Sequence, residues 1–241
     1  MSEPVSTIQR LAAVNNAAWC LAMWQAHSLE AQRGLGMAMC RGTPPKYYPS
    51  AVTIDPKADV AAQTEWLTRL VVEGPPGGAS VKDSFNRLDL TAHGYGRLIQ
   101  AQWLHRPPQN ETPRPALDWR LVETADDLAA WETPWSGGNP DDAGIFAPAL
   151  LGNPGVGVMA GWDGETLAAG CVLAPTDSVV GVSNVFGVDA FASQAEAAAI
   201  AQAMFPGKGL VGYEHGEALE AALACGYQAI GGLTVWATWA A

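Results

Sequence analysis

Two similar segments, one closing each half of the chain, constrain the fold more than any other feature of this sequence. Residues 92–103 read AHGYGRLIQAQW, residues 224–236 read ACGYQAIGGLTVW, and the two Gly-Tyr pairs are 132 residues apart. Upstream, a strand pattern at 51–54 and a helical pattern over 58–72 parallel those at 181–186 and 194–204. A repeat present only twice predicts a duplicated domain, because a solenoid needs three or more short units. Each half is therefore predicted to run strand, helix, strand, helix, Gly-aromatic, strand.

The domain boundary is predicted from proline content. Residues 106–115 read RPPQNETPRP, with four prolines in ten residues, which neither a helix nor a central strand can continue. A chain of 241 residues allows one or two domains. We therefore expect one domain over residues 1–105, a proline-rich linker over 106–118 and a second domain over 119–241.

Charge is divided unevenly between the halves. Residues 1–120 contain twelve Lys and Arg against ten Asp and Glu, whereas residues 121–241 contain only Lys208 against fourteen acids. Nucleic acid is excluded as an expected partner, because phosphate binding needs clustered basic residues. The acidic residues either simply solvate the second half or attract a cationic amine.

The second half resembles the GCN5-related N-acetyltransferase (GNAT) family. The order of predicted elements and the Gly226-Tyr227 pair before a last strand carry the resemblance: hairpin strands 156–162 and 165–174, strand 179–186, helix 194–204, strand 210–213 and helix 216–225. The resemblance implies an α+β (mixed α/β) fold with two GNAT-like domains, each a mostly antiparallel central sheet flanked by helices. It also implies transfer of an acetyl group from acetyl-CoA to an amine.

The phosphate-binding loop of that family departs from its pattern here. GNAT proteins open the central helix with Q/R-x-x-G-x-G/A, but residues 188–194 read VDAFASQ, without glycine or arginine. We interpret Asp189 as a helix-start residue that opposes phosphates. Acetyl-CoA is then expected to contact main-chain groups of Val185, Phe186, Gly187 and Val188. A literal match at residues 33–38, RGLGMA, is interpreted as a loop leading into a short strand.

Candidate catalytic residues lie before the second Gly-Tyr pair. The family often has a Tyr four residues before this pair to protonate the leaving thiolate, and Ala222 stands there. Tyr213-Glu214-His215 is the densest polar cluster of the second half. Glu214 and His215 are predicted bases for an amine, although loop residues before a helix would look the same.

Three functions remain open at this point: a diverged acetyltransferase, a non-catalytic module that binds a small molecule or CoA derivative, and a structural or interaction protein. The partner is expected to be a small-molecule acceptor, while its identity and the oligomeric state cannot be read. No metal ligands at suitable spacing and no apolar run of membrane-spanning length are found, so we expect a cytoplasmic protein with reduced, isolated cysteines.

Overall fold

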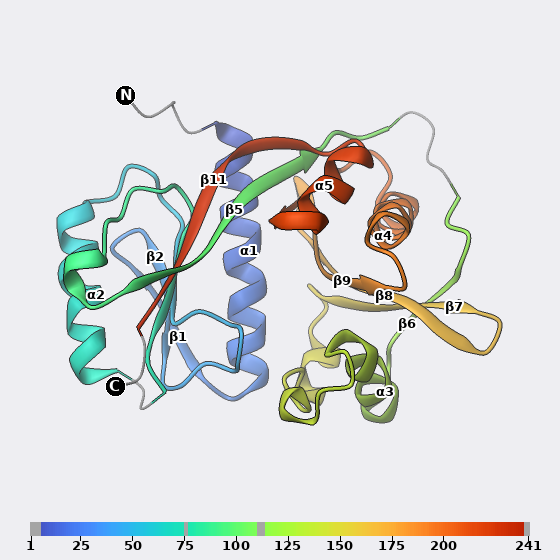
Figure 1. Ribbon diagram of the computed structural model, residues 1–241, viewed down its shortest axis with the longest axis horizontal. Helices are drawn as coiled ribbons and strands as arrows, with labels where there is room; N and C mark the ends of the chain where they lie inside the picture. Colours follow the sequence, from blue (N-terminus) through green and yellow to red (C-terminus); the bar gives the residue numbers. More distant parts are fainter. Residues whose placement is uncertain (1–5, 75–76, 110–113, 239–241) are drawn as a thin grey trace. The chain divides into compact units, whose positions relative to one another are not determined.

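The computed structural model describes residues 6–74, 77–109 and 114–238, and these divide into two compact units. The first unit contains the described residues up to Gln102 together with those from Gly231 on. The second unit runs from Trp103 to Ile230. Neighbouring strands pair in the order β1-β2-β3-β4-β11-β5-β10-β9-β8-β7-β6, and Figure 1 labels most of these strands. Mixed α+β architecture is confirmed.

The first unit consists of a sheet with one helix on each face. Its elements are α1 (Thr7–Ala26), β1 (Glu30–Gly34), β2 (Met37–Arg41), β3 (Ala51–Thr53), α2 (Val60–Glu73), β4 (Ser80–Asp83), the 3-10 turn η1 (Thr91–His93) and the first part of β5 (Gly96–Arg106). Met37, Val81 and Trp236 pack with Leu67 of α2 in one core. The adjacent Lys82 side chain points the other way, to Asn16 of α1. Alternation along a strand thus gives each helix its own face of the sheet.

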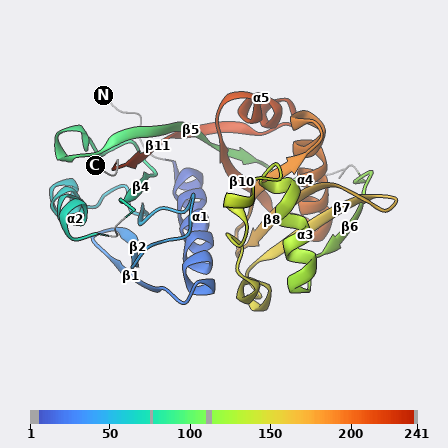
Figure 2. The same cartoon turned by 60° about the horizontal axis from the view of Figure 1, so that its bottom comes forward.

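The second unit has the same plan with a longer sheet. Its elements are β6 (Asp118–Leu121), α3 (Ala125–Trp135), the 3-10 turns η2 (Pro140–Asp142) and η3 (Pro148–Gly152), β7 (Gly157–Asp163), β8 (Thr166–Pro175), β9 (Val179–Gly187), α4 (Ala190–Met204), β10 (Gly209–Glu214), α5 (Gly216–Ala224) and the start of β11 (Gln228–Ala237). Cys171 of β8 packs in the core beneath the alanines of α4. Its neighbour Gly170 faces Trp131 of α3. The two helices therefore cover opposite faces (Figures 1 and 2).

The element order of the predicted duplication is present. β3, α2, β4, η1 and β5 correspond to β9, α4, β10, α5 and β11, with the second helix of the first copy reduced to a 3-10 turn. In each copy the first two strands are parallel: Ala51 pairs with Val81 in one, and Val179 pairs with Gly209 in the other. That the copies superpose as whole domains stays a prediction.

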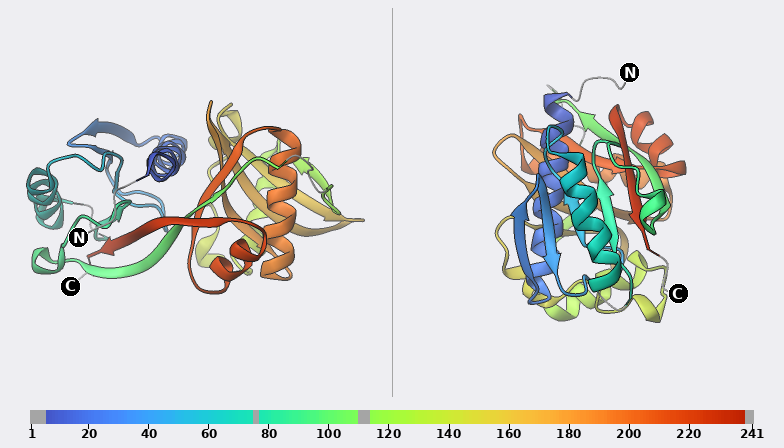
Figure 3. Two further views of the ribbon diagram at one scale, coloured as in Figure 1. Left: turned by 90° about the horizontal axis from the view of Figure 1, so that it is seen from above. Right: turned by 90° about the vertical axis from the view of Figure 1, so that its left-hand side faces the viewer.

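The last strands are exchanged between the copies. β4 of the first copy pairs antiparallel with β11, from Thr234–Asp83 to Ala237–Ser80. β10 of the second copy has β5 as its neighbour, and the rings of Trp103 and Tyr213 meet edge to face at 5.5 Å. The unit boundaries consequently differ from the predicted ranges 1–105 and 119–241, since residues 231–238 belong to the first unit. Figure 3 follows β5 and β11 along their length.

Local features of the sequence explain where several elements begin and turn. Leu35 and Gly36 both have positive φ, 54° and 68°, and form the hairpin turn between β1 and β2. The predicted short strand follows at Met37, but Arg33 and Gly34 belong to β1, so the turn is limited to residues 35 and 36. α1 ends at Ala26, and Glu30 begins β1. Within the predicted linker 106–118, residues 110–113 lie outside the described part of the chain.

Of the helices in the described residues, none combines the length and apolar character needed to cross a membrane.

Candidate functional site

The parallel strands β9 and β10 pair over a short distance and then separate. Their register covers three residue pairs, ending at Val211–Gly181. β9 nevertheless continues to Gly187 and β10 to Glu214. Among the described residues, β9 and β10 form no register pair past Val211–Gly181. Divergent carboxyl ends of neighbouring parallel strands are where open sheets place their ligand sites.

A β-bulge lies in β9 before this end. The β8–β9 register shifts between Gly170–Phe186 and Val172–Ser183, so β9 carries one extra residue there. Asn184 within the bulge has φ 53°, an uncommon conformation for a residue other than glycine, and its amide donates to Ser183 Oγ at 3.0 Å. A bulge leaves main-chain groups outside the ladder and changes the direction of the strand. Val185 to Val188 follow directly.

The connection from β9 to α4 is short and closed by internal hydrogen bonds. Asp189 caps the helix, and its Oδ1 accepts the main-chain N–H of Ala192 at 2.8 Å. Ser193 Oγ donates to the carbonyl of Asp189 at 2.6 Å. A Cβ on Gly187 would collide with this hydroxyl, so glycine permits the close approach. The interpretation of Asp189 as a helix-start residue is confirmed, although the helix begins at Ala190 rather than 194.

The side chain of Phe186 packs against α3. Its ring meets Trp131 of α3 edge to face at 5.1 Å, and the Trp131 Nε1–H donates to the carbonyl of Met159 at 2.9 Å. Gly170 lies beneath both rings, where any Cβ would overlap them. Among the four predicted cofactor contacts, Phe186 can therefore offer only its main chain. Val188 is 97% exposed.

Glu214 is the last residue of β10 and is partly buried. Gln194, buried on the second turn of α4, donates its Nε2–H to Glu214 Oε1 at 3.3 Å. Burial raises the pKa of the Glu214 carboxyl to about 7, and the hydrogen bond from Gln194 opposes part of that rise. A carboxyl group with a pKa near the working pH can both accept and return a proton.

The structure separates the two predicted bases. His215 is exposed and occupies the N-cap position of α5, where its side chain makes no capping hydrogen bond. Glu214, by contrast, points to α4, at the same edge of the sheet as residues 185–188. The geometry supports Glu214 more strongly than His215 as the reactive group.

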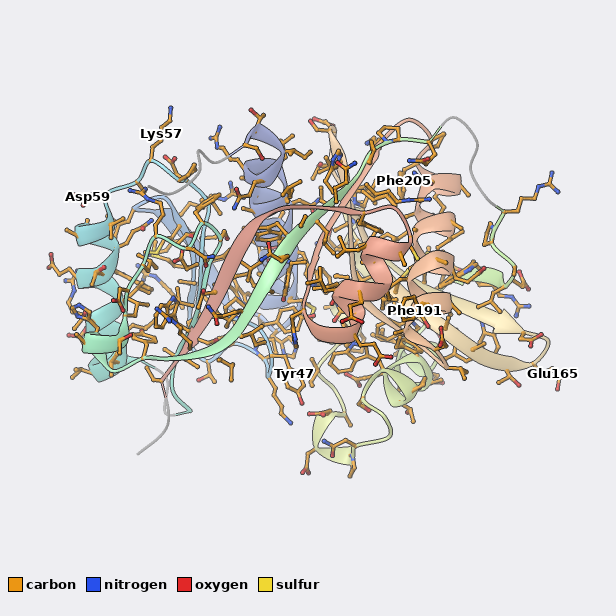
Figure 4. All side chains as sticks on the ribbon, turned by 45° about the horizontal axis from the view of Figure 1, so that its top comes forward. Tyr47, Lys57, Asp59, Glu165, Phe191 and Phe205 are labelled. Carbon is orange, nitrogen blue, oxygen red and sulfur yellow. The ribbon has the colours of Figure 1, made fainter. Side chains whose placement is uncertain are left out.

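Three features of the candidate site were not predicted from the sequence: Gln194, the bulge at Asn184 and the Trp131 ring. Gln194 lies at the start of the predicted helix, so its type and position were visible, but its bond to Glu214 depends on how α4 packs. Figure 4 locates α4 by Phe191 near its beginning and Phe205 at its end. Within the described residues, no three His, Cys, Asp or Glu side chains are grouped so as to hold a metal ion.

Several solved structures that align over most of this chain are described as GNAT proteins. A GCN5-related N-acetyltransferase from Kribbella flavida aligns with a TM-score of 0.57 at 17% identity over 92% of this chain and 95% of its own. A putative GNAT-family acetyltransferase from Novosphingobium aromaticivorans gives 0.57 at 14% identity, over 93% of this chain and 97% of its own. One from Sphaerobacter thermophilus gives 0.52 at 13% identity, over 98% and 94%.

No protein-family model and no curated protein matches the sequence. The chain therefore has the GNAT fold over nearly its whole length, as the Gly-Tyr repeat and element order had suggested. At identities this low, the structural alignments establish the fold alone. Function has to be argued from the residues of the site.

Proposed function

We propose that the second unit is a diverged N-acetyltransferase that moves an acetyl group from acetyl-CoA to an amine of a small, cationic acceptor. The observation that carries this proposal is the open end of the β9–β10 pair, with the partly buried Glu214 at its edge. The GNAT fold supports it.

Acetyl-CoA would be held mainly by main-chain groups of Val185, Phe186, Gly187 and Val188. Main-chain N–H and C=O groups that are not paired in a strand ladder can form hydrogen bonds with the carbonyl and N–H groups along the arm of acetyl-CoA that carries the thioester. The start of α4 fits a diphosphate poorly, because the Asp189 carboxylate already takes the N–H of Ala192 and adds a negative charge. The proposed fit is thus to the strand end rather than to the helix start.

Glu214 would prepare the acceptor. An amine arrives protonated and cannot attack a thioester until it loses a proton. The unprotonated Glu214 carboxylate takes that proton directly or through one water, a step typically worth about a hundredfold to ten-thousandfold in rate. The nitrogen then attacks the thioester carbon, the C–S bond breaks, and the proton that the nitrogen must still lose passes to the departing thiolate or to water. Ala222 supplies no acid, but a thiol with a pKa of about 8.5 leaves acceptably as thiolate.

The acidic character of the second half supports a cationic acceptor. Between residues 121 and 241 only Lys208 opposes fourteen acids. Such a surface raises the local concentration of cations and repels carboxylates.

Acetylation of a panel of polyamines and amino sugars tests the proposal, with wild type, Glu214→Gln and the exposed-site control Glu220→Gln compared. We expect Glu214→Gln to lose about a hundredfold or more in turnover and Glu220→Gln to lose less than about twofold. Wild-type turnover should rise with pH through about 7, as Glu214 loses its proton. Equal turnover in both variants would refute the assignment of Glu214.

Asp189 and Ala222 favour a second candidate, a non-catalytic module that binds an acyl-CoA or a related small molecule. A thermal-shift titration separates the two functions: ligand at 100 times its dissociation constant adds about 2.7 kcal/mol of stability. Stabilisation by acetyl-CoA without turnover of any amine would select the binding module.

A further inference from the structure

A cavity of about 330 Å³ lies in the second unit between α3 and the loop that follows it. One wall is a single stripe of α3 with helical spacing, consisting of Ala125, Leu128, Ala129, Glu132, Thr133 and Ser136. The opposite wall is the loop from Gly138 to Pro148. Its size is at the lower end of small-molecule sites, enough for one ring with a short chain.

Glu132 holds the two walls of this cavity together and places a carboxylate in its lining. The side chain is only 5% exposed. One carboxylate oxygen accepts the N–H of Gly144 at 2.6 Å, and the other accepts the N–H of Phe146 at 2.8 Å. Both oxygens keep a lone pair, since an ionised carboxylate has about four acceptor positions. The loop is thereby tied to the helix around a buried negative charge.

The remaining wall is apolar on one side and accepts hydrogen bonds on the other. Leu128, Phe146 and Pro148 supply carbon surface. The Thr133 hydroxyl donates to the main-chain carbonyl of Ala129, and the Ser136 hydroxyl donates to that of Thr133. Their oxygens can still accept. A ligand that offers several N–H donors beside an apolar group would match both sides.

The local charge excludes an anion. Residues 121–150 contain six acids, Glu123, Asp126, Asp127, Glu132, Asp141 and Asp142, and no Lys or Arg occurs between 121 and 207. An anionic ligand would meet repulsion without any compensating cation, whereas an ammonium group would be attracted.

We propose that this cavity binds a primary ammonium ion carrying a compact apolar group, such as an arylalkylamine. The three N–H donors of the ammonium group meet Glu132 and the hydroxyl oxygens of Thr133 and Ser136, and the ring packs against Leu128 and Phe146. The proposal stands independently of acyl transfer, because binding requires no acyl donor.

An aromatic chain provides a spectroscopic signal for occupancy. The Phe146 ring meets Trp131 edge to face at 5.0 Å and Trp135 at 4.8 Å. A ligand against Phe146 should therefore shift the indole N–H resonances of both tryptophans.

Titration of the whole protein with phenethylamine, 2-phenylethanol and phenylacetate, without acetyl-CoA, tests the ligand class. We expect the amine to bind about tenfold or more tightly than the alcohol and the carboxylate not to bind, with shifts at the Trp131 and Trp135 indoles. Equal binding of amine and alcohol, or no binding of the amine at millimolar concentration, would overturn the proposal.

Variants on one helix locate the ligand. Ala129→Phe fills the cavity and should abolish binding, whereas Ala130→Phe, at an exposed neighbour outside the lining, should leave it unchanged. Glu132→Gln should reduce the preference for amine over alcohol to less than about threefold. Glu214→Gln should not affect binding. Equal loss in both alanine variants, or loss in Glu214→Gln, would place the amine elsewhere and refute this site.

Discussion

The two copies of the repeat end their parallel strand pairs differently. In the first unit, Thr53 Oγ1 accepts the N–H of Ser84 at 2.8 Å, and the buried Asp83 carboxylate accepts the N–H groups of Phe85 at 3.3 Å and Leu88 at 2.8 Å. Internal partners thus close that strand end. In the second unit β9 and β10 run past their last pair, and Gln194 donates a hydrogen bond to Glu214 at the end of β10.

The two strand ends therefore differ in whether side chains of the same unit hydrogen-bond to their main-chain N–H groups. The hydrogen bonds from Thr53 and Asp83 stabilise the strand end of the first unit. Under the proposed function, the groups of β9 and β10 past their last pair are the ones that contact the ligand.

Removing the strand-end carboxylate of the first unit should have the largest effect. Asp83→Ala leaves two buried N–H groups without their acceptor and should lower the free energy of unfolding by about 2–4 kcal/mol. Urea denaturation measures this. Asp163→Ala, at an exposed hairpin position, is the control and should change stability by less than about 0.5 kcal/mol. An unchanged free energy of unfolding in Asp83→Ala would mean that these hydrogen bonds do not stabilise the strand end of the first unit.

Removing the strand-end carboxylate of the second unit should have the opposite sign. The unfolded chain loses the Glu214 proton near the ordinary value of 4.5, and the folded chain only near a pKa of about 7, so stability falls as pH rises between these values. Glu214→Gln should therefore be more stable than wild type at pH 8, by roughly 1–3 kcal/mol, and indistinguishable from it at pH 4. Denaturation at both pH values, with Glu220→Gln as control, checks this. A loss of stability at pH 8 would contradict the described environment of Glu214.

Much of this comparison was visible in the sequence, but its decisive parts were not. The Gly-Tyr pairs predicted the element order, and Asp189 was correctly read as the start of α4. The exchange of β5 and β11 between the copies, the early end of the β9–β10 ladder and the Gln194–Glu214 bond all depend on contacts between distant segments. Periodicity along one segment reports burial, not which strand becomes its neighbour.

The two repeat tyrosines offer a smaller test. Tyr95 Oη donates to the carbonyl of Leu67 at 2.9 Å, whereas the buried Tyr227 hydroxyl has no hydrogen-bond partner among the described residues. Tyr95→Phe should cost about 1–1.5 kcal/mol, and Tyr227→Phe less than about 0.5 kcal/mol. Thermal unfolding of both variants decides it, and equal costs would remove this distinction between the copies.

The helix caps provide the smallest expected effect. Asp59 caps α2 and Asp189 caps α4. Asn caps a helix about as well as Asp, so both Asp→Asn variants should stay within about 0.5 kcal/mol of wild type in stability. Only Asp189→Asn should tighten acetyl-CoA binding, by about twofold to fivefold in calorimetry. This substitution removes a negative charge that opposes the phosphates of acetyl-CoA. Unchanged or weaker affinity would count against the proposed placement.

Amide chemical-shift mapping during titration of the whole protein with acetyl-CoA tests the contrast between the open and the closed strand end most directly. The shifts should concentrate at residues 185–188 and 212–214, while Thr53, Ser84 and Leu88 remain unperturbed. Shifts centred on the first unit, or no shifts at millimolar acetyl-CoA, would contradict the assignment of the ligand site to the open end of β9 and β10.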